Sequence, residues 1–322
     1  MKPYLIGVDL GGTFIKTAIV TGAGEMLYKV EVPSEKEKGP DGVISNIGKS
    51  IHSVMKEKGI KPDQVEAIGI GSPGPLDTER GYVHRAINLP GWLNIPLRDR
   101  VEEILGIRAN LENDANAAAY GEYWRGAGRG ASIMLAYTLG TGVGGGVIIN
   151  GKLIRGVNDT AGELGHMTIV PDGDLCPCGN RGCVESYASA TSLVRRTRQK
   201  LERGSQSILL EWMEKGEPLT AKLIDEAHRS GDSFAREVLE EVGYYLALGV
   251  SNTVNALNPD VVVIGGGMMK AGEVILEPLK QEVKRRIFPE LWDGLKIIPA
   301  KLGNDAGVIG AAGLILERAG LV

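Results

Sequence analysis

The sequence predicts an α/β protein of two domains with a ligand site in the cleft between them. Three observations support this. Strand and helix patterns alternate along the chain, a meander of strands followed by strand–helix units begins near residue 4 and again near residue 132, and each of these two stretches contains a glycine-rich turn between apolar strands. Alternating strands and helices favour sheets covered by helices. A chain of 322 residues is long enough for two buried cores.

Apolar periodicity predicts the elements of both stretches. In the first we expect strands at 4–10, 14–20, 25–32, 65–70 and 108–112, and helices at 40–58, 97–105 and 114–126. In the second we expect a hairpin at 132–149, mostly helical chain over 185–257, strands at 261–264 and 296–299 with a helix between them, and a last helix at 305–319. The predicted N-terminal domain is 1–118, joined by the C-terminal helix within 305–322, and the larger domain is 119–304.

The two glycine-rich turns predict a clamp for a polyphosphate. The first follows Asp9 and contains Gly11, Gly12 and Thr13, and the second is Gly140-Thr141-Gly142. Glycine permits a tight turn and lets a ligand approach backbone N–H groups that a Cβ would shield. Two such turns facing each other would hold one polyphosphate between them.

Composition excludes several function classes. The net charge of −4 gives no basic footprint for nucleic acid. No apolar run reaches the roughly 18 residues typical of a membrane span. The first strand begins so close to Met1 that we expect no signal peptide, and three cysteines within eight residues form no disulfide framework. We therefore expect a cytoplasmic protein without a membrane or nucleic-acid partner.

Two stretches match the dinucleotide fingerprint G-x-G-x-x-G, but neither has the required context. That fingerprint lies between a strand and a helix, because the pyrophosphate binds at the helix N-terminus. The match at 140–145 is followed by a strand, and the match at 69–74 leads into Pro75 and a loop. A dehydrogenase is therefore not the favoured interpretation.

One histidine and three cysteines have the composition of a structural zinc site. His166 is followed by Cys176, Cys178 and Cys183, and Gly179 and Gly182 allow the chain to fold back. Four such ligands complete the tetrahedral sphere of zinc, so the metal would order the loop rather than activate water. The competing interpretation is three ordinary buried thiols and an unrelated histidine.

A polar pair lies where a strand is expected to meet a helix. Asn113 and Asp114 follow the strand 108–112 and precede an alanine-rich helix, which is the usual ligand edge of an open α/β sheet. Either residue would serve as an ordinary helix N-cap. Beside a polyphosphate clamp, a carboxylate would instead accept the proton of an alcohol during phosphoryl transfer.

Together these motifs resemble the ROK family of repressors and sugar kinases over essentially the whole chain. The resemblance rests on Asp9-x-Gly11-Gly12-Thr13, the turn at 139–142, Glu163-x-x-His166 and the cysteine signature 176–185. Asn88-Leu89-Pro90-Gly91-Trp92 points to the glucokinases within the family. The resemblance implies an actin/hexokinase-like (ribonuclease H-like) fold, ATP and glucose as substrates, Mg²⁺, structural Zn²⁺, and a homodimer or homotetramer.

The resemblance also implies residue roles. Asp114 would be the general base that activates the sugar 6-hydroxyl. The other residues at the sugar would be Gly74, Asn88, Asn113, Glu163, His166 and Glu185. Those at the nucleotide and its Mg²⁺ would be Asp9, Gly11, Gly12, Thr13, Thr141, Gly142, Gly265, Gly266 and Gly267. The zinc ligands would be His166, Cys176, Cys178 and Cys183. The alternative for 265–267 is a simple strand-to-helix connection.

Two classes of protein that are not enzymes fit the sequence less well. A ROK repressor would have a DNA-binding module ahead of the first glycine turn, and because the first hairpin starts at residue 6 we expect none here. A filament protein with actin-like turns would have no reason for the cysteine loop. Within the enzymes, a kinase for fructose, mannose, N-acetylmannosamine or N-acetylglucosamine is the competing interpretation.

Overall fold

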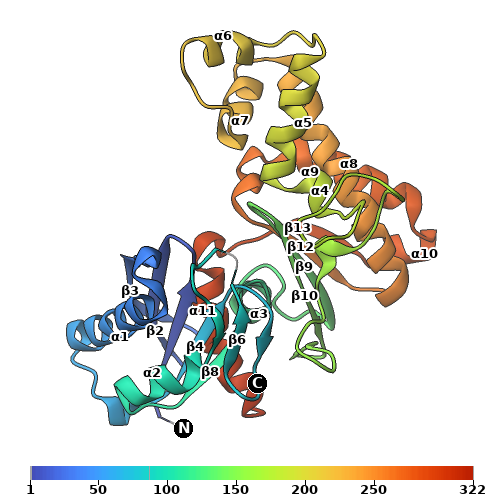
Figure 1. The fold of residues 1–322 in the computed structure, drawn as a ribbon. Coiled ribbons are helices and arrows are strands. Elements are labelled where there is room, and N and C mark those ends of the chain that lie inside the picture. The colour runs from blue at the N-terminus through green and yellow to red at the C-terminus, as the bar shows by residue number, and fades with distance from the viewer. Residues whose placement is uncertain (1, 87, 322) are drawn as a thin grey trace. The chain divides into compact units, whose positions relative to one another are not determined.

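The computed structural model describes residues 2–86 and 88–321 (Figure 1). The chain folds as two compact units. The first is Met1–Ser132, Gly146–Gly162 and Lys301–Val322, and the second is Ile133–Gly145 and Glu163–Ala300. This division keeps helix α3 (Asp114–Arg125) whole, whereas the limit at 118/119 expected from the sequence falls within that helix.

A five-stranded sheet forms the centre of the first unit. Its order is β3-β2-β1-β4-β8, and its strands are β1 (Tyr4–Leu10), β2 (Phe14–Thr21), β3 (Met26–Pro33), β4 (Val65–Ser72) and β8 (Ala109–Asn113). The first three are antiparallel, and β4 and β8 run parallel to β1. Asp9 lies opposite Gly71, and Ser72 opposite Asn113. The carboxyl ends of the three parallel strands therefore share one edge.

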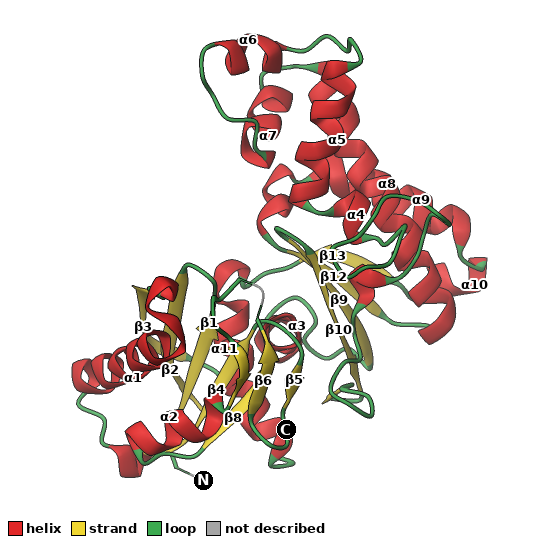
Figure 2. Ribbon diagram, viewed as in Figure 1, coloured by secondary structure: helices red, strands yellow, loops and turns green. Residues whose placement is uncertain are grey.

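Helices cover both faces of this sheet (Figure 2). Helices α1 (Gly39–Lys58) and α2 (Leu97–Leu105) pack on one face through one apolar cluster. Helix α11 (Ala306–Arg318) packs on the other, where Val308 and Ile315 join a cluster with Leu5 and Val20 of the strands. Short 3₁₀ turns precede α1, β4 and α11, at Lys36–Lys38, Pro62–Gln64 and Gly303–Asp305.

The close approach of α3 and α11 depends on glycine. A Cβ on Gly310 would lie 1.7 Å from the carbonyl oxygen of Ala117, and one on Gly121 would lie 2.2 Å from that of Ala306. Both contacts are to backbone atoms, so side-chain motion cannot relieve them. Because α3 begins at Asp114, this packing fixes the helix that carries the predicted base.

Gly310→Ala is expected to lower the free energy of unfolding by about 3 kcal/mol, because the methyl group must push two helix backbones apart. Urea denaturation measures the change. Gly294→Ala is the matched control, since a Cβ there meets nothing within 4 Å. Equal midpoints for the two variants would contradict this account of the packing.

A small sheet of three short strands was not expected from the sequence. It consists of β5 (Leu76–Asp77), β6 (Tyr82–Arg85) and β7 (Leu93–Ile95). Strands of two to four residues are too short to show a period-two pattern. The loops next to it carry Gly74 and Asn88.

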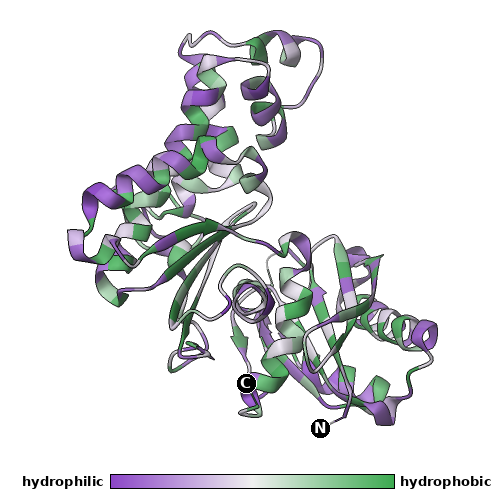
Figure 3. Ribbon diagram, turned by 180° about the vertical axis from the view of Figure 1, so that it is seen from behind, coloured by the Kyte–Doolittle hydropathy of each residue, from purple (hydrophilic) through white to green (hydrophobic). Residues whose placement is uncertain are grey.

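The second sheet repeats the plan of the first. Its order is β11-β10-β9-β12-β13, with β9 (Ile133–Leu139), β10 (Val143–Ile149), β11 (Lys152–Leu153), β12 (Val261–Gly265) and β13 (Lys296–Pro299). Strand β12 is parallel to both β9 and β13. The predicted duplication of an α/β plan is therefore confirmed. In Figure 3 the strands are coloured largely as hydrophobic, as expected for sheets covered by helices.

The remaining helices belong to the second unit. They are α4 (Glu185–Ala188), α5 (Ala190–Glu202), α6 (Ile208–Glu214), α7 (Ala221–Arg229), α8 (Ser233–Leu257), α9 (Glu273–Arg286) and α10 (Pro289–Trp292), with 3₁₀ turns at Leu164–His166 and Gly267–Ala271. Ser207, Thr220 and Asp232 cap three of them. No helix among the described residues has the length and apolarity needed to cross a bilayer.

Candidate functional site

The catalytic candidates of the first unit lie along one edge of its sheet. Asp9 is the penultimate residue of β1, and Asn113 ends β8. Strand β4 lies between them, and a Cβ on its Gly71 would be 3.7 Å from the Cα of Asp114. The sheet thus brings the predicted Mg²⁺ residue and the predicted base to the same edge.

The turn from β8 into α3 is fixed by its own side chains. Asn113 Oδ1 accepts hydrogen bonds from the backbone N–H of Ala115 at 2.9 Å and of Asn116 at 3.1 Å. Asn113 is therefore the N-cap of α3, which was the competing interpretation for this residue. Since Oδ1 is used in the cap, the amide Nδ2 is the group that remains to donate to a ligand. Asp114 Oδ1 accepts from Ala115 N at 2.8 Å, and the side chain is partly exposed.

Asp9 lies between the first glycine turn and the start of α11. A Cβ on Gly307 would be 2.9 Å from Asp9 Cγ, so the absence of a side chain at 307 makes room for the carboxylate. Burial raises the pKa of Asp9, and the nearby Lys16 opposes that rise. Lys16 is directly opposite Asp9 in the pairing of β1 with β2, and its Nζ is 3.7 Å from Asp9 Oδ2. Nothing in the sequence around Lys16 distinguishes it from an ordinary strand residue, so this pairing was not predicted.

The first glycine turn is fixed by both backbone and side-chain hydrogen bonds. Gly11 N donates to Phe14 O at 2.9 Å, and Ser34 Oγ donates to Gly12 O at 3.1 Å. The Cβ of Asn88 lies 3.3 Å from where a Cβ of Gly12 would be. Asn88 is exposed, so its side chain is accessible beside the turn that contains Thr13.

Gly74 has a backbone that only glycine readily adopts. Its φ is +95°, and a Cβ there would be 2.0 Å from Arg85 O. Glycine has no side chain to offer a ligand. The contribution of Gly74 is therefore to shape the loop between β4 and β5.

In the second unit, the second glycine turn is tied to the cysteine loop. Val143 N donates to Glu185 Oε2 at 2.9 Å, and a Cβ on Gly142 would lie 2.3 Å from that oxygen. Thr191 Oγ1 donates to Thr141 O at 2.7 Å. The family resemblance implies that Glu185 is a sugar ligand, but it does not predict this bond to the turn.

The glycines 265–267 lie beside the second glycine turn. Gly265 pairs with Thr138 across the sheet. Gly266 has a φ of +92°, and a Cβ there would be 2.2 Å from Leu139 O. Gly267 begins the 3₁₀ turn at 267–271. The segment joins a strand to a helix, as in the alternative interpretation, and its exposed Gly266 lies against the backbone of Leu139, the residue before the second glycine turn.

Four predicted zinc ligands converge. One ligand atom from each of His166, Cys176, Cys178 and Cys183 lies within 4.8 Å of all the others. His166 Nδ1 is 3.5 Å from Cys176 Sγ, and Cys178 Sγ is 3.8 Å from Cys183 Sγ. Gly179 and Gly182 have φ values of +95° and +74°, which lets the loop reverse as the sequence indicated.

These separations fit a zinc ion. Zinc bonds of about 2.3 Å to sulfur and about 2.1 Å to nitrogen place tetrahedral ligands about 3.5–3.8 Å apart. Without a cation, burial raises the pKa of the Cys176 thiol to about 12, so metal binding would displace protons. The arrangement favours a metal site over three unrelated thiols.

His166 Nδ1 faces the cysteine cluster, which leaves the other ring nitrogen, Nε2, on the opposite side. His166 Nε2 is 3.9 Å from Glu163 Oε2, beyond hydrogen-bond length. The Glu163 side chain is 56% exposed. Gly165 permits this turn, because a Cβ there would be 1.9 Å from Val143 O. Glu163 and His166 Nε2 therefore present an acceptor and a ring nitrogen side by side.

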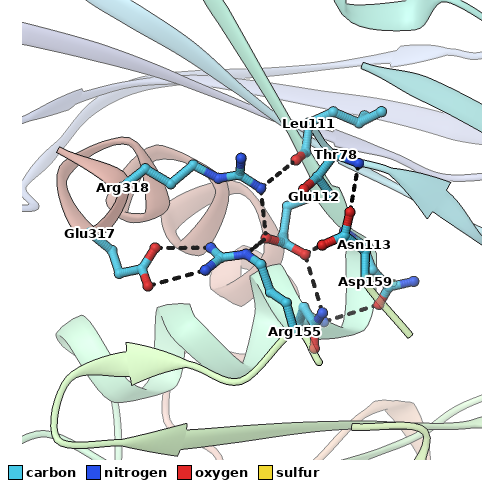
Figure 4. A network of polar contacts seen from close by, with 9 residues as sticks. Thr78, Leu111, Glu112, Asn113, Arg155, Asp159, Glu317 and Arg318 are labelled. Carbon is cyan, nitrogen blue, oxygen red and sulfur yellow. Dashed lines mark hydrogen bonds and ion pairs between the residues drawn. The ribbon is translucent and has the colours of Figure 1, made fainter. Parts of the chain in front are cut away.

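A buried ionic network next to Asn113 was not predicted. Glu112 is 3% exposed, and its Oε2 is 2.7 Å from Arg155 Nε. Arg155 also binds both carboxylate oxygens of Glu317, at 3.1 and 2.9 Å. Figure 4 shows Arg155 between the two carboxylates, with Arg318 alongside. In the sequence, only the charge of Glu112 within an otherwise uncharged strand could have indicated this network.

Comparisons with known proteins agree with this arrangement. A family model described as the ROK family matches residues 5–318. A glucokinase of Halalkalibacterium halodurans is 42% identical over 98% of this chain and 96% of its own, and one of Thermotoga maritima is 40% identical over 99% of both. The crystal structure of a ROK family glucokinase from Streptomyces griseus, in complex with glucose and AMPPNP, has a TM-score of 0.82 and 36% identity over 97% of this chain and 98% of that one.

The chain belongs to the ROK family. It has the actin-like sugar kinase fold, and both the family and the fold expected from the sequence are confirmed.

Proposed function

We propose that the protein is a glucokinase that transfers the γ-phosphoryl group of ATP to the 6-hydroxyl of glucose. The full-length similarity to proteins named glucokinase supports this activity. The observation that carries it is the shared sheet edge of Asp9, the first glycine turn and Asp114, which combines a phosphate loop with a carboxylate. The cleft between domains expected from the sequence stays a prediction.

In this proposal Asp114 takes the proton of the attacking hydroxyl. A sugar alcohol is a weak nucleophile, and phosphoryl transfer depends mainly on alignment and on stabilisation of charge. Asp114 is the first residue of α3, and Asn113 caps the N-terminal N–H groups of that helix. The backbone that carries the Asp114 carboxylate is therefore held in place. The proton moves from the hydroxyl to Asp114 as the oxygen–phosphorus bond forms and the bond to ADP breaks.

The remaining sugar hydroxyls would be bound by groups whose partners within the protein are now known. Asn113 offers Nδ2, because Oδ1 is used in the cap. Glu185 offers Oε1, because Oε2 accepts from Val143 N and a Cys176 thiolate bound to zinc would no longer donate to Oε1. Glu163 and His166 Nε2 complete the polar set, with Asn88 beside the first turn and Gly74 shaping its loop. A bound sugar would bury these polar groups, and an epimer that leaves one of them unpaired would bind less well, which gives such a site its selectivity.

The nucleotide would be bound by the glycine turns. Gly11, Gly12 and Thr13 would contact phosphate from one turn, Thr141 and Gly142 from the other, and Gly265, Gly266 and Gly267 would lie at the adenosine. Asp9 would hold Mg²⁺ through water. That ion, when bound, neutralises charge on the phosphates.

We assign the Cys₃His cluster to structural zinc. Four protein ligands leave no open position for a water or substrate. The ion would order the loop 176–183, which ends two residues before Glu185. It would thereby hold the backbone of Glu185 where Oε2 accepts from Val143 N.

A steady-state panel of sugars tests the proposed function. With ATP and Mg²⁺, glucose is expected to give the highest kcat/KM, and the product should be phosphorylated at the 6-position. Fructose, mannose, N-acetylmannosamine and N-acetylglucosamine are the competing substrates. A higher kcat/KM for one of them would assign the protein to that sugar, and no sugar-dependent ADP formation would reject a kinase.

The same assay compares ATP with ADP and polyphosphate as donors, and we expect ATP to be used. Sedimentation of the same sample tests the expected dimer or tetramer, which stays a prediction.

A further inference from the structure

The carboxylate of Glu112 is bonded directly to the turn that carries the predicted base. Its Oε1 accepts from Asn113 N at 3.1 Å and from Asn116 Nδ2 at 3.1 Å. Asn113 precedes Asp114, and Asn116 lies in the first turn of α3. One oxygen of Glu112 therefore bridges the end of β8 and the start of α3.

The other oxygen of Glu112 faces two arginines. Oε2 is 2.7 Å from Arg155 Nε and 3.4 Å from an Nη atom of Arg318. Arg155 in turn forms a two-bond contact with Glu317, and Arg318 donates to Leu111 O at 3.1 Å. Two carboxylates and two guanidinium groups balance one another, which a buried carboxylate requires.

Arg155 belongs to a stretch that is itself anchored. Ala161 N donates to Arg155 O at 3.0 Å and closes the loop. Asp159 Oδ2 accepts from Thr78 N at 2.8 Å, next to the small sheet of the first unit. Arg155 therefore comes from a loop with a fixed position, and its two carboxylate contacts fix its guanidinium plane.

We propose that Glu112, oriented by Arg155, is a positioning residue for the reaction: it holds the Asn113–Asp114 turn in the orientation in which Asp114 meets the sugar hydroxyl. This inference rests on the proposed function. The ion pair is too deeply buried to serve solubility, and buried ion pairs in general add little net stability. The direct hydrogen bond from Asn113 N to Glu112 means that the ion pair can instead fix the position of the Asn113–Asp114 turn. A misplacement of about 1 Å can lower a rate by about 10²-fold.

Three substitutions test this role. Glu112→Gln retains an oxygen for Asn113 N but turns an amide donor toward Arg155. Arg155→Met removes the charge at similar length, and Arg155→Lys retains charge without the planar fork. Glu122→Gln is the matched control: Glu122 is also 3% exposed and accepts backbone N–H bonds, from Ala127, Lys301 and Leu302, at the other end of α3.

Glu112→Gln and Arg155→Met are each expected to lower kcat about 10- to 100-fold. KM for glucose should rise, because Asn113 moves with the turn. KM for ATP should stay within about twofold, because among the described residues the network makes no hydrogen bond or ion pair to a glycine turn. Arg155→Lys should recover part of the loss. The double variant Glu112→Gln/Arg155→Met should lose no more kcat than the single variant with the larger loss, as expected for residues that act as one unit.

The measurements are made below the melting temperature of every variant, so that loss of folded protein does not mimic loss of kcat. The inference is overturned if Glu112→Gln and Arg155→Met lower only the melting temperature, as Glu122→Gln should, and keep wild-type kcat. Wild-type protein without glucose-dependent turnover would instead reject the proposed function, before any variant is compared.

Discussion

Asp114→Asn is expected to lower kcat for glucose by about 10²- to 10⁴-fold, the usual contribution of a general base. Asparagine has nearly the same shape, and its side-chain oxygen can still accept from Ala115 N, which Asp114 Oδ1 does at 2.8 Å. It cannot take a proton from the attacking hydroxyl. Glucose affinity, measured by calorimetry or intrinsic fluorescence, should therefore change much less than kcat.

Asp41→Asn is the control for Asp114→Asn. Asp41 lies in the first turn of α1 and is paired with Arg100 on the surface, so it also places a carboxylate at a helix start. We expect its kcat to equal that of the wild type. Wild-type kcat in Asp114→Asn would remove the assigned base.

Loss of the proposed zinc ion is expected to have the second large effect. Cys183→Ala removes one ligand of the cluster, and Cys183 is fully buried. Metal binding contributes on the order of 10 kcal/mol to ordering a structural site of this kind. Without it, the loop that fixes Glu185 loses its brace, so KM for glucose should rise by about tenfold or more and kcat should fall. Elemental analysis should find one zinc per wild-type chain and none in the variant.

Chelation separates the effect of losing the metal from the effect of the Cys183→Ala substitution itself. Wild-type protein treated with a strong chelator should show the same change in KM for glucose, and added zinc should restore it. Added zinc should not restore Cys183→Ala. A chelated protein that is free of zinc and has unchanged kinetics would show that the cluster does not support the sugar site.

Much of the fold was predictable because its signals are local. The apolar runs that bracket the two glycine turns predict β1, β2, β9 and β10 to within one or two residues. The predicted helices 97–105 and 114–126 correspond closely to α2 and α3. The small sheet β5-β6-β7 escaped prediction because its strands are shorter than the period that identifies a strand.

The parts of the site that depend on distant contacts were not predictable. The cysteine cluster is compact in sequence and has a distinctive composition, so its convergence was expected. The partners of Glu112, in contrast, are Arg155 and Arg318, and nothing near those two residues in the sequence indicates a contact with β8. The bond from Val143 N to Glu185 depends in the same way on tertiary packing.

Helix α11 has a consequence for synthesis of the protein. It covers one face of the first sheet, where Ala312 and Ile315 pack with Leu5 and Ala67, yet it is translated after every strand of both sheets. During synthesis, that apolar sheet face stays exposed to solvent until α11 leaves the ribosome. The second unit, 133–145 and 163–300, has been fully translated by then. Nascent chains stalled before α11 should therefore engage chaperones or aggregate through the N-terminal part.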